Sequence, residues 1–166
     1  MKFILILILI LILGLFSFSD EATDGPVEPA PNFSMTTASG KKISLRSFEG
    51  EVVYVSFWAS WCGVCKKNFK AYKKVRKQLE DKGVILLNVS MDKDEEKWRA
   101  AMEKHDIDGI HTRVDDYDTV QELYQLYSLP SYEILDKGQL QVYLSDAPGR
   151  DIFSDFDKWL ALPTRP

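Results

Sequence analysis

The feature that most constrains the fold is a dense run of β-branched and aromatic residues that leads toward the only two cysteines of the chain. Residues 52–57 read VVYVSF, which is typical of a β-strand buried on both faces of a sheet. After Cys62 the apolar residues recur three or four positions apart among lysines, which predicts an amphipathic helix ending near Gly83. Cys62 and Cys65 therefore lie where a buried strand gives way to a helix.

Other strand patterns lie on both sides of this junction. A leading hairpin is expected from residues 33–37 and 42–45, a second buried strand at 84–89, and a later hairpin from 132–135 and 140–144. A strand–helix–strand unit followed by a hairpin and a final helix predicts an α/β fold. Its central mixed β-sheet is flanked by helices on both faces, and the N-terminal β-hairpin extends it.

The helices are expected from apolar periodicity and from capping residues. Asp92 and Glu95 can form a capping box that opens one helix, and Pro130 ends another, which carries Val120, Leu123, Tyr124 and Tyr127. A loop with room for a short strand covers residues 107–116, and apolar spacing over 153–160 predicts a closing helix.

The chain begins with what reads as an export signal over residues 1–19, because one lysine precedes an unbroken apolar run and small residues follow it. The apolar run over 3–18 is close to the length that spans a bilayer, so an uncleaved N-terminal membrane anchor is the alternative. Residues 20–31, rich in proline and acids, predict a flexible linker, and the folded domain is expected over 32–166. Either reading predicts a periplasmic or other extracytoplasmic domain, where disulfides persist.

Composition narrows the class of partner. With 45% hydrophobic and 28% charged residues the chain fits a globular domain. Its formal charge of −4, without a basic stripe of the sort that phosphate backbones require, argues against a nucleic-acid partner.

The position of the cysteine pair predicts its chemistry. The first turn of a helix has unpaired N–H groups and the positive end of the helix dipole, and both favour a thiolate over a thiol. Cys62, at or before this turn, is expected to be the attacking thiolate, with an exposed sulfur. Cys65, one turn further on and more buried, is expected to resolve the mixed disulfide.

Two other uses of the cysteines are possible. A structural disulfide over so short a loop would restrict the unfolded chain little. A zinc site would need four ligands, and the chain offers only Cys62, Cys65, His105 and His111, with His105 on an apolar helix face. We therefore expect no metal site, and no cofactor other than the redox-active Cys62–Cys65 disulfide.

Residues 57–67, FWASWCGVCKK, resemble the active-site segment of the thioredoxin superfamily. The segments 30–33 and 40–45, together with the Trp98 helix, resemble the exported or membrane-tethered TlpA/ResA-like branch. Leu129-Pro130-Ser131, followed by a strand and the acidic-Gly turn 136–138, resembles the cis-proline loop of that branch. The likeness covers residues 30–162.

The resemblance implies a dithiol–disulfide oxidoreductase. It implies substrate contacts from Trp61, Gly63, Val64, Leu129 and Pro130, with the backbone of Leu129 presented to the substrate peptide. It also implies partner proteins with thiols or disulfides, and a membrane thiol donor of the DsbD/CcdA type that returns the enzyme to its reduced state. Members of the branch commonly act as reductases, which is the direction we expect.

The chain departs from the family pattern at several positions. Ser56 stands six residues before Cys62, where thioredoxins carry a buried acid, and Asn68 replaces a carboxylate of the ResA-like proteins. Gly63-Val64 replaces the common Xaa-Pro dipeptide, and Lys70 stands where many relatives have a helix-kinking proline. The missing proline leaves one more N–H near the first cysteine, which predicts a more oxidising disulfide.

Three other functions are considered. A redox-inactive module is suggested by Ser56 and Asn68. A copper-binding module of the Sco type would use a wider cysteine spacing, with His105 or His111 as a further ligand. Peroxide reduction is suggested by the leading hairpin, but Ala59 occupies the place where a peroxidatic motif has threonine.

Overall fold

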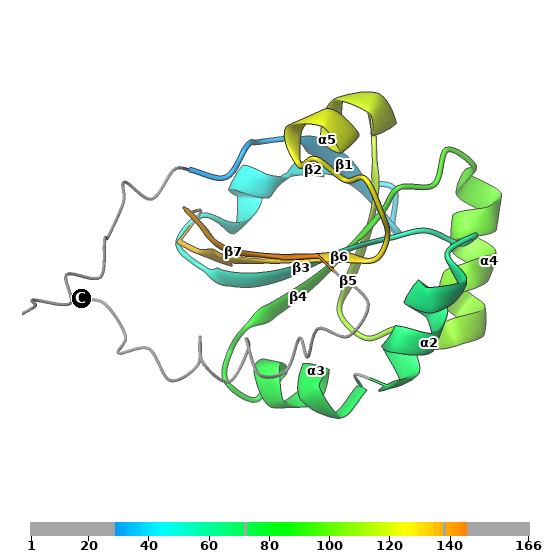
Figure 1. Ribbon diagram of the computed structural model, residues 1–166, viewed down its shortest axis with the longest axis horizontal. Helices are drawn as coiled ribbons and strands as arrows, with labels where there is room; N and C mark the ends of the chain where they lie inside the picture. The colour runs from blue at the N-terminus through cyan, green and yellow to red at the C-terminus, as the bar shows by residue number, and fades with distance from the viewer. Residues whose placement is uncertain (1–28, 72, 138, 146–166) are drawn as a thin grey trace, which may run out of the picture.

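The computed structural model describes residues 29–71, 73–137 and 139–145 (Figure 1). Within these residues seven strands form one sheet in the order β2-β1-β5-β4-β3-β6-β7. The strands are β1 (Ser34–Thr37), β2 (Lys42–Ser44), β3 (Val52–Trp58), β4 (Ile85–Ser90), β5 (Ile110–Val114), β6 (Ser131–Asp136) and β7 (Gln139–Ser145). Because β3 pairs in parallel with β4 and antiparallel with β6, the sheet is mixed, as the sequence predicts.

Helices cover both faces of the sheet. The described helices are the 3-10 helix η1 (Leu45–Phe48) and the α-helices α2 (Gly63–Ala71), α3 (Lys73–Glu80), α4 (Glu95–His105) and α5 (Tyr117–Leu123). In Figure 1, α5 lies on one side of the sheet, and α2, α3 and α4 lie on the other. The hairpin β1–β2 extends the sheet by pairing β1 antiparallel with β5. The predicted fold class is confirmed.

Neighbouring side chains of β3 point to opposite faces of the sheet and join different clusters of the core. Val53, Val55 and Phe57 join the cluster that contains Tyr124. Trp58, at the end of the strand, joins the other cluster, which contains both cysteines, Phe69 of α2 and Trp98 of α4. The strand is thus buried on both faces, and its last residue lies in the cluster that contains both cysteines.

Two local predictions about helices were wrong in detail. The N-cap of α4 is Asp94, whose carboxylate accepts from the N–H groups of Glu96 and Lys97, whereas Asp92 turns toward other partners. The helix expected after Cys62 is divided into α2 and α3, on either side of position 72, which lies outside the described residues.

Several predictions fall outside the described residues. These are the export signal or anchor over 1–19, most of the linker over 20–31, and the closing helix over 153–160. At the end of the predicted linker, Ala30 already packs against the core, and the carbonyl of Pro31 accepts a hydrogen bond from the Tyr124 hydroxyl. No helix within the described part of the chain is both long enough and apolar enough to cross a membrane.

Candidate active site

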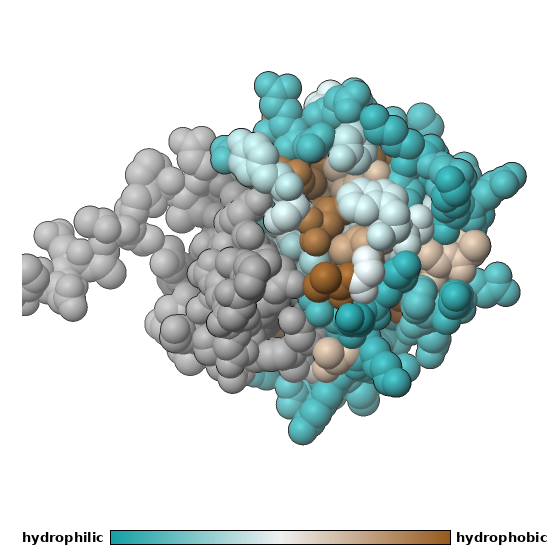
Figure 2. Space-filling view, turned by 45° about the vertical axis from the view of Figure 1, so that its right-hand side comes forward, coloured by the Kyte–Doolittle hydropathy of each residue, from teal (hydrophilic) through white to brown (hydrophobic). Residues whose placement is uncertain are grey.

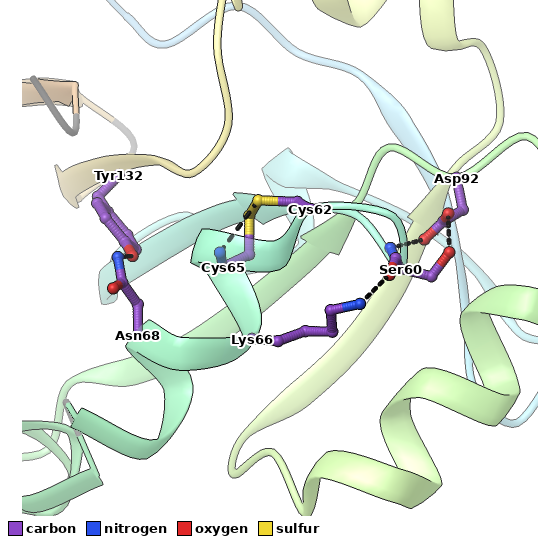
Figure 3. The surroundings of a disulfide bond; sticks show 7 residues. All are labelled: Ser60, Cys62, Cys65, Lys66, Asn68, Asp92 and Tyr132. Atoms are coloured by element: carbon purple, nitrogen blue, oxygen red, sulfur yellow. Dashed lines mark hydrogen bonds between the residues drawn. A yellow bond between two sulfur atoms is a disulfide. The ribbon is translucent and has the colours of Figure 1, made fainter.

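Cys62 occupies the position that caps the N-terminus of α2. The chain leaves β3 at Trp58, turns through residues 59–61 and enters α2 at Gly63. The Cys62 N–H donates to the carbonyl of Ala59 over 3.0 Å, and the Cys65 N–H donates to Cys62 Sγ over 3.1 Å. Figure 3 shows this contact between backbone and sulfur. The sulfur therefore receives one of the N–H groups that a helix start leaves unpaired.

The two cysteines form a disulfide at the start of α2, with a Cα–Cα distance of 5.3 Å. Cys65 is buried to 1% exposure, and Cys62 is 6% exposed. The predicted order of burial is correct, but Cys62 is less accessible than the sequence suggested, because the bonded sulfur turns inward over the first helical turn.

A buried carboxylate fixes the turn that precedes Cys62. Asp92 accepts hydrogen bonds from the Ser60 N–H over 2.8 Å, from the Ser60 hydroxyl over 2.7 Å and from the Ser90 hydroxyl over 2.7 Å. Lys66 Nζ donates to the Ser60 carbonyl over 2.8 Å, which ties α2 back to the same turn. Figure 3 shows the contacts of Ser60 with Asp92 and Lys66 beside the disulfide. Charge-assisted bonds of this kind hold the backbone around the reactive sulfur.

Sequence reasoning missed this role of Asp92, because the residue was assigned as a helix cap. One signal could have identified it. Asp92 follows a buried strand that is parallel to β3, and the carboxyl ends of parallel strands meet at one edge of the sheet.

The predicted substrate-contact residues surround the disulfide. Trp61 is 64% exposed and Val64 is 52% exposed, which is unusual for large apolar side chains. A Cβ built on Gly63 would have no neighbour within 4 Å, so the surface is open there. The Leu129–Pro130 peptide bond is cis, and Leu129 packs against both core clusters. Figure 2 shows hydrophobic and intermediate residues near the middle of the face that it draws, with hydrophilic residues above, below and to the right of them.

A small cavity adjoins these residues. It measures about 160 Å³, and Trp61 and Leu129 line it together with side chains from α5 and from the segment that follows α5. The cavity thus connects the turn before Cys62 with the loop that carries Pro130.

The two positions at which the family carries an acid hold neutral side chains with different surroundings. The Ser56 hydroxyl is buried on β3 and has no hydrogen-bond partner in the part of the chain that the structure describes. Asn68 Nδ2 donates to the Tyr132 hydroxyl over 3.1 Å and so joins α2 to β6. Neither position supplies a carboxylate to accept a proton from Cys65.

A buried carboxyl that the sequence did not single out lies on β6. Glu133 has no measurable exposure, and neither of its oxygens has a hydrogen-bond partner among the described residues. Burial raises the pKa of Glu133 to about 8. Glu133 pairs with Val55 across the β3–β6 ladder, so it lies on the face of Val55, which is opposite the face of Trp58 and the disulfide. It belongs to the fold and not to the sulfur chemistry.

The two histidines are not gathered with the cysteines into a recognisable metal site. His111 Nε2 contacts the Ile107 carbonyl at 2.6 Å, and burial lowers the pKa of His111. His105 lines a surface hollow with lysines of α2. Within residues 29–71, 73–137 and 139–145, no group of three or more His, Cys, Asp or Glu side chains is placed to hold a metal ion.

Comparison with known proteins agrees with this geometry. Residues 26–149 match the AhpC/TSA family. The chain is 35% identical over 117 residues to the thioredoxin-like protein YneN of Bacillus subtilis, covering 69% of this chain and 68% of that protein. It is 28% identical over 124 residues to the thiol-disulfide oxidoreductase ResA of Bacillus cereus, covering 75% of this chain and 70% of that protein.

A solved structure supports the same assignment. The thioredoxin domain of a thiol-disulfide oxidoreductase from Bacteroides vulgatus superposes with a TM-score of 0.70 at 27% identity, covering 80% of this chain and 96% of that one. The CxxC disulfide lies at the N-terminus of α2, as this similarity requires. The chain therefore belongs to the AhpC/TSA family and is a thioredoxin-like thiol-disulfide oxidoreductase of the ResA type.

Proposed function

We propose that the protein acts outside the cytoplasm as a reductase of disulfides in partner proteins. The observation that carries the proposal is the Cys62–Cys65 disulfide at a helix N-terminus, where Cys62 Sγ accepts a backbone N–H. A donor that stabilises the bonded sulfur stabilises a negatively charged sulfur more strongly, because charge-assisted hydrogen bonds are stronger than neutral ones. The export signal or anchor over 1–19 supports the compartment.

The reaction begins with the reduced protein. The Cys62 thiolate attacks one sulfur of the partner's disulfide, a bond forms between that sulfur and Cys62, and the other partner sulfur leaves as a thiolate. Cys65 then loses its proton and attacks Cys62 Sγ, which releases the second partner thiolate and forms the Cys62–Cys65 disulfide. Two electrons pass from the protein to the partner, and both partner thiolates take up protons from solvent.

The surrounding residues have roles in docking. Trp61, Gly63 and Val64 form the open rim beside Cys62, and the backbone at Leu129 and Pro130 provides hydrogen-bonding groups for an extended substrate segment. A membrane thiol donor of the DsbD/CcdA type would return the disulfide to the dithiol. The protein needs no further cofactor in this scheme.

An insulin-reduction assay tests the proposal, with a small-molecule thiol present to return the Cys62–Cys65 disulfide to the dithiol. Wild type is expected to accelerate precipitation of the insulin B chain, and Cys62→Ser is expected to abolish the acceleration. Equal rates for the two proteins would support the redox-inactive alternative instead. Retention of one Cu(I) ion per chain in the presence of glutathione, lost in His105→Ala or His111→Ala, would support the Sco-like alternative.

Peroxide reduction is a second candidate, because the family match includes AhpC in its description. Ala59 stands where a peroxidatic motif has threonine. We therefore expect no consumption of hydrogen peroxide above the rate of the thiol donor alone.

A further inference from the structure

A concentration of positive charge begins one turn from the disulfide. Six lysines on α2 and α3 form a surface that we name the lysine face. They are Lys66, Lys67, Lys70, Lys73, Lys74 and Lys77. The same two helices contain a single acid, Glu80, although the chain as a whole has a formal charge of −4. Charge is therefore separated on the molecule, and its positive part adjoins the cysteines.

Four of the six lysines have no counter-charge among the described residues. Lys73 pairs with Asp106 at 3.3 Å, Lys77 pairs with Asp81 at 3.2 Å, and Lys66 is bound to the Ser60 carbonyl. Exposed side chains without an ion pair to any described residue complete the face: Lys67, Lys70 and Lys74. Such charges are available to a partner.

The shape and the local potential agree with docking of an anionic group. Lys66, Lys67 and Lys70 line a surface hollow of about 440 Å³, which His105 closes on the α4 side. Burial, and then the charges of Lys66 and Lys104, lower the pKa of His105. The lysines thus maintain a positive potential in the hollow.

We propose that the lysine face docks an acidic segment of the redox partner and so presents the partner's cysteine to Cys62. This inference rests on the proposed function, since it concerns the approach of a partner to the same disulfide. The exposed Val64 lies between Cys62 and the lysines, which gives the surface an apolar part beside the reacting sulfur and a charged part beyond it. This arrangement matches the apolar core and polar rim of protein interfaces.

Helix geometry sets where the acids should lie in the partner. With a rise of about 1.5 Å per residue, Lys67 and Lys70 lie roughly 7 and 12 Å along α2 from Cys62. An extended peptide covers about 3.3 Å per residue, so acids two to four residues from the partner's cysteine reach these lysines. An anionic membrane is a poorer occupant, because a flat bilayer against this face would block the approach of a partner protein to Cys62.

The test uses peptides whose single cysteine is disulfide-bonded to 2-mercaptoethanol. The peptides form two pairs, and each pair has one member with three glutamates and one member with three glutamines. In the first pair these three residues lie two to four positions after the cysteine. In the second pair they lie two to four positions before it. Each exposed ion pair is worth a factor of about 1.5 to 5 in binding. The reduced wild type is therefore expected to reduce one of the two glutamate peptides about tenfold faster than its glutamine partner at low ionic strength, with the ratio approaching one at about 0.5 M salt.

Two double variants with equal changes of net charge locate the effect. Lys67→Glu/Lys70→Glu is expected to abolish or invert the ratio between glutamate and glutamine peptides. Lys41→Glu/Lys137→Glu is expected to keep it. The control lysines lie in turns at the far end of the sheet, since Lys137 N–H binds the Glu51 carbonyl before β3, and the β1–β2 turn lies beside the start of β5. The measured quantity is the ratio of the rates at which one variant reduces the glutamate and the glutamine peptide. A change in the intrinsic reactivity of the dithiol alters both rates equally and so leaves this ratio unchanged.

Three results would overturn the proposal. These are equal rates for both peptides of each pair, an equal loss of preference in the two double variants, and binding to vesicles with 30% anionic lipid combined with no peptide preference. Reduction of bis(2-hydroxyethyl) disulfide by wild type keeps this test separate from the proposed function. If that uncharged reagent is reduced while the peptides are not distinguished, the lysine face fails and the proposed function stands.

Discussion

Replacement of Glu133 by glutamine should make the protein more stable at neutral pH. Glu133 is buried on β6, no described residue forms a hydrogen bond with either of its oxygens, and burial raises its pKa from 4.5 to about 8. Between these two pH values the folded protein retains a proton that the unfolded chain releases. The free energy of unfolding of wild type therefore falls as the pH rises from about 4.5 to 8.

The size of the effect follows from the shift. One pKa unit corresponds to about 1.4 kcal/mol. The rise from 4.5 to about 8 therefore lowers the free energy of unfolding by at most about 5 kcal/mol above pH 8, and by roughly 3 kcal/mol at pH 7. Glutamine is close in shape and cannot ionise. Its amide is buried without a partner, like the protonated carboxyl that it replaces, so the two proteins should be about equally stable near pH 4.5.

Urea unfolding of wild type and Glu133→Gln at pH 4.5, 6, 7 and 8 measures this directly. The stability advantage of the variant should grow from near zero to about 3 kcal/mol at pH 7. Glu122→Gln, at an exposed position on α5, serves as the control and should follow wild type at every pH. An advantage that is the same at pH 4.5 and pH 8 would refute the reasoning, because it would mean that the ionisation of Glu133 does not differ between the folded and unfolded states.

Three further predictions concern the site and its support. Asp92→Asn places an amide donor against the groups that donate hydrogen bonds to the Asp92 carboxylate. Urea unfolding should therefore show that this variant loses about 2–4 kcal/mol of stability. The control, Asp106→Asn at an exposed position, should change the stability by less than about 1 kcal/mol. Gly109→Ala should lower the melting temperature by several degrees, because Gly109 has a φ of +94° and a new Cβ would lie 2.5 Å from a backbone oxygen; Gly63→Ala, which meets nothing, should not. Cys65→Ser should accumulate a mixed disulfide with substrate proteins that mass spectrometry detects and that dithiothreitol releases, and absence of any such adduct would contradict the assigned roles.

The core of the fold could be predicted because its signals are local. The run over 52–57 is apolar at every position but one, and its β-branched and aromatic residues are typical of a strand buried on both faces. The change to helical spacing after Cys62 is equally direct. These two patterns place both cysteines at a strand–helix junction without any knowledge of the rest of the chain. The order of burial of the cysteines follows from the same geometry.

Long-range contacts account for what the sequence did not reveal. By local rules Asp92 is an acceptable helix cap. In the structure its carboxylate instead accepts hydrogen bonds from Ser60 and Ser90, and Ser60 is 32 residues away in the sequence. Glu133 occupies a predicted strand in which an acid would ordinarily face solvent. Only the pairing of β6 beside the central β3 shows that both faces of this strand are covered.

Alkylation of the fully reduced protein tests the central claim most directly, since the claim is that Cys62 is the attacking sulfur and Cys65 waits behind it. Iodoacetamide applied for graded times at pH 7, followed by peptide mass spectrometry, gives a separate rate for each cysteine. We predict that Cys62 reacts at least about tenfold faster than Cys65 and faster than a cysteine in an unstructured peptide. Equal rates for the two cysteines, or a faster reaction at Cys65, would contradict the account.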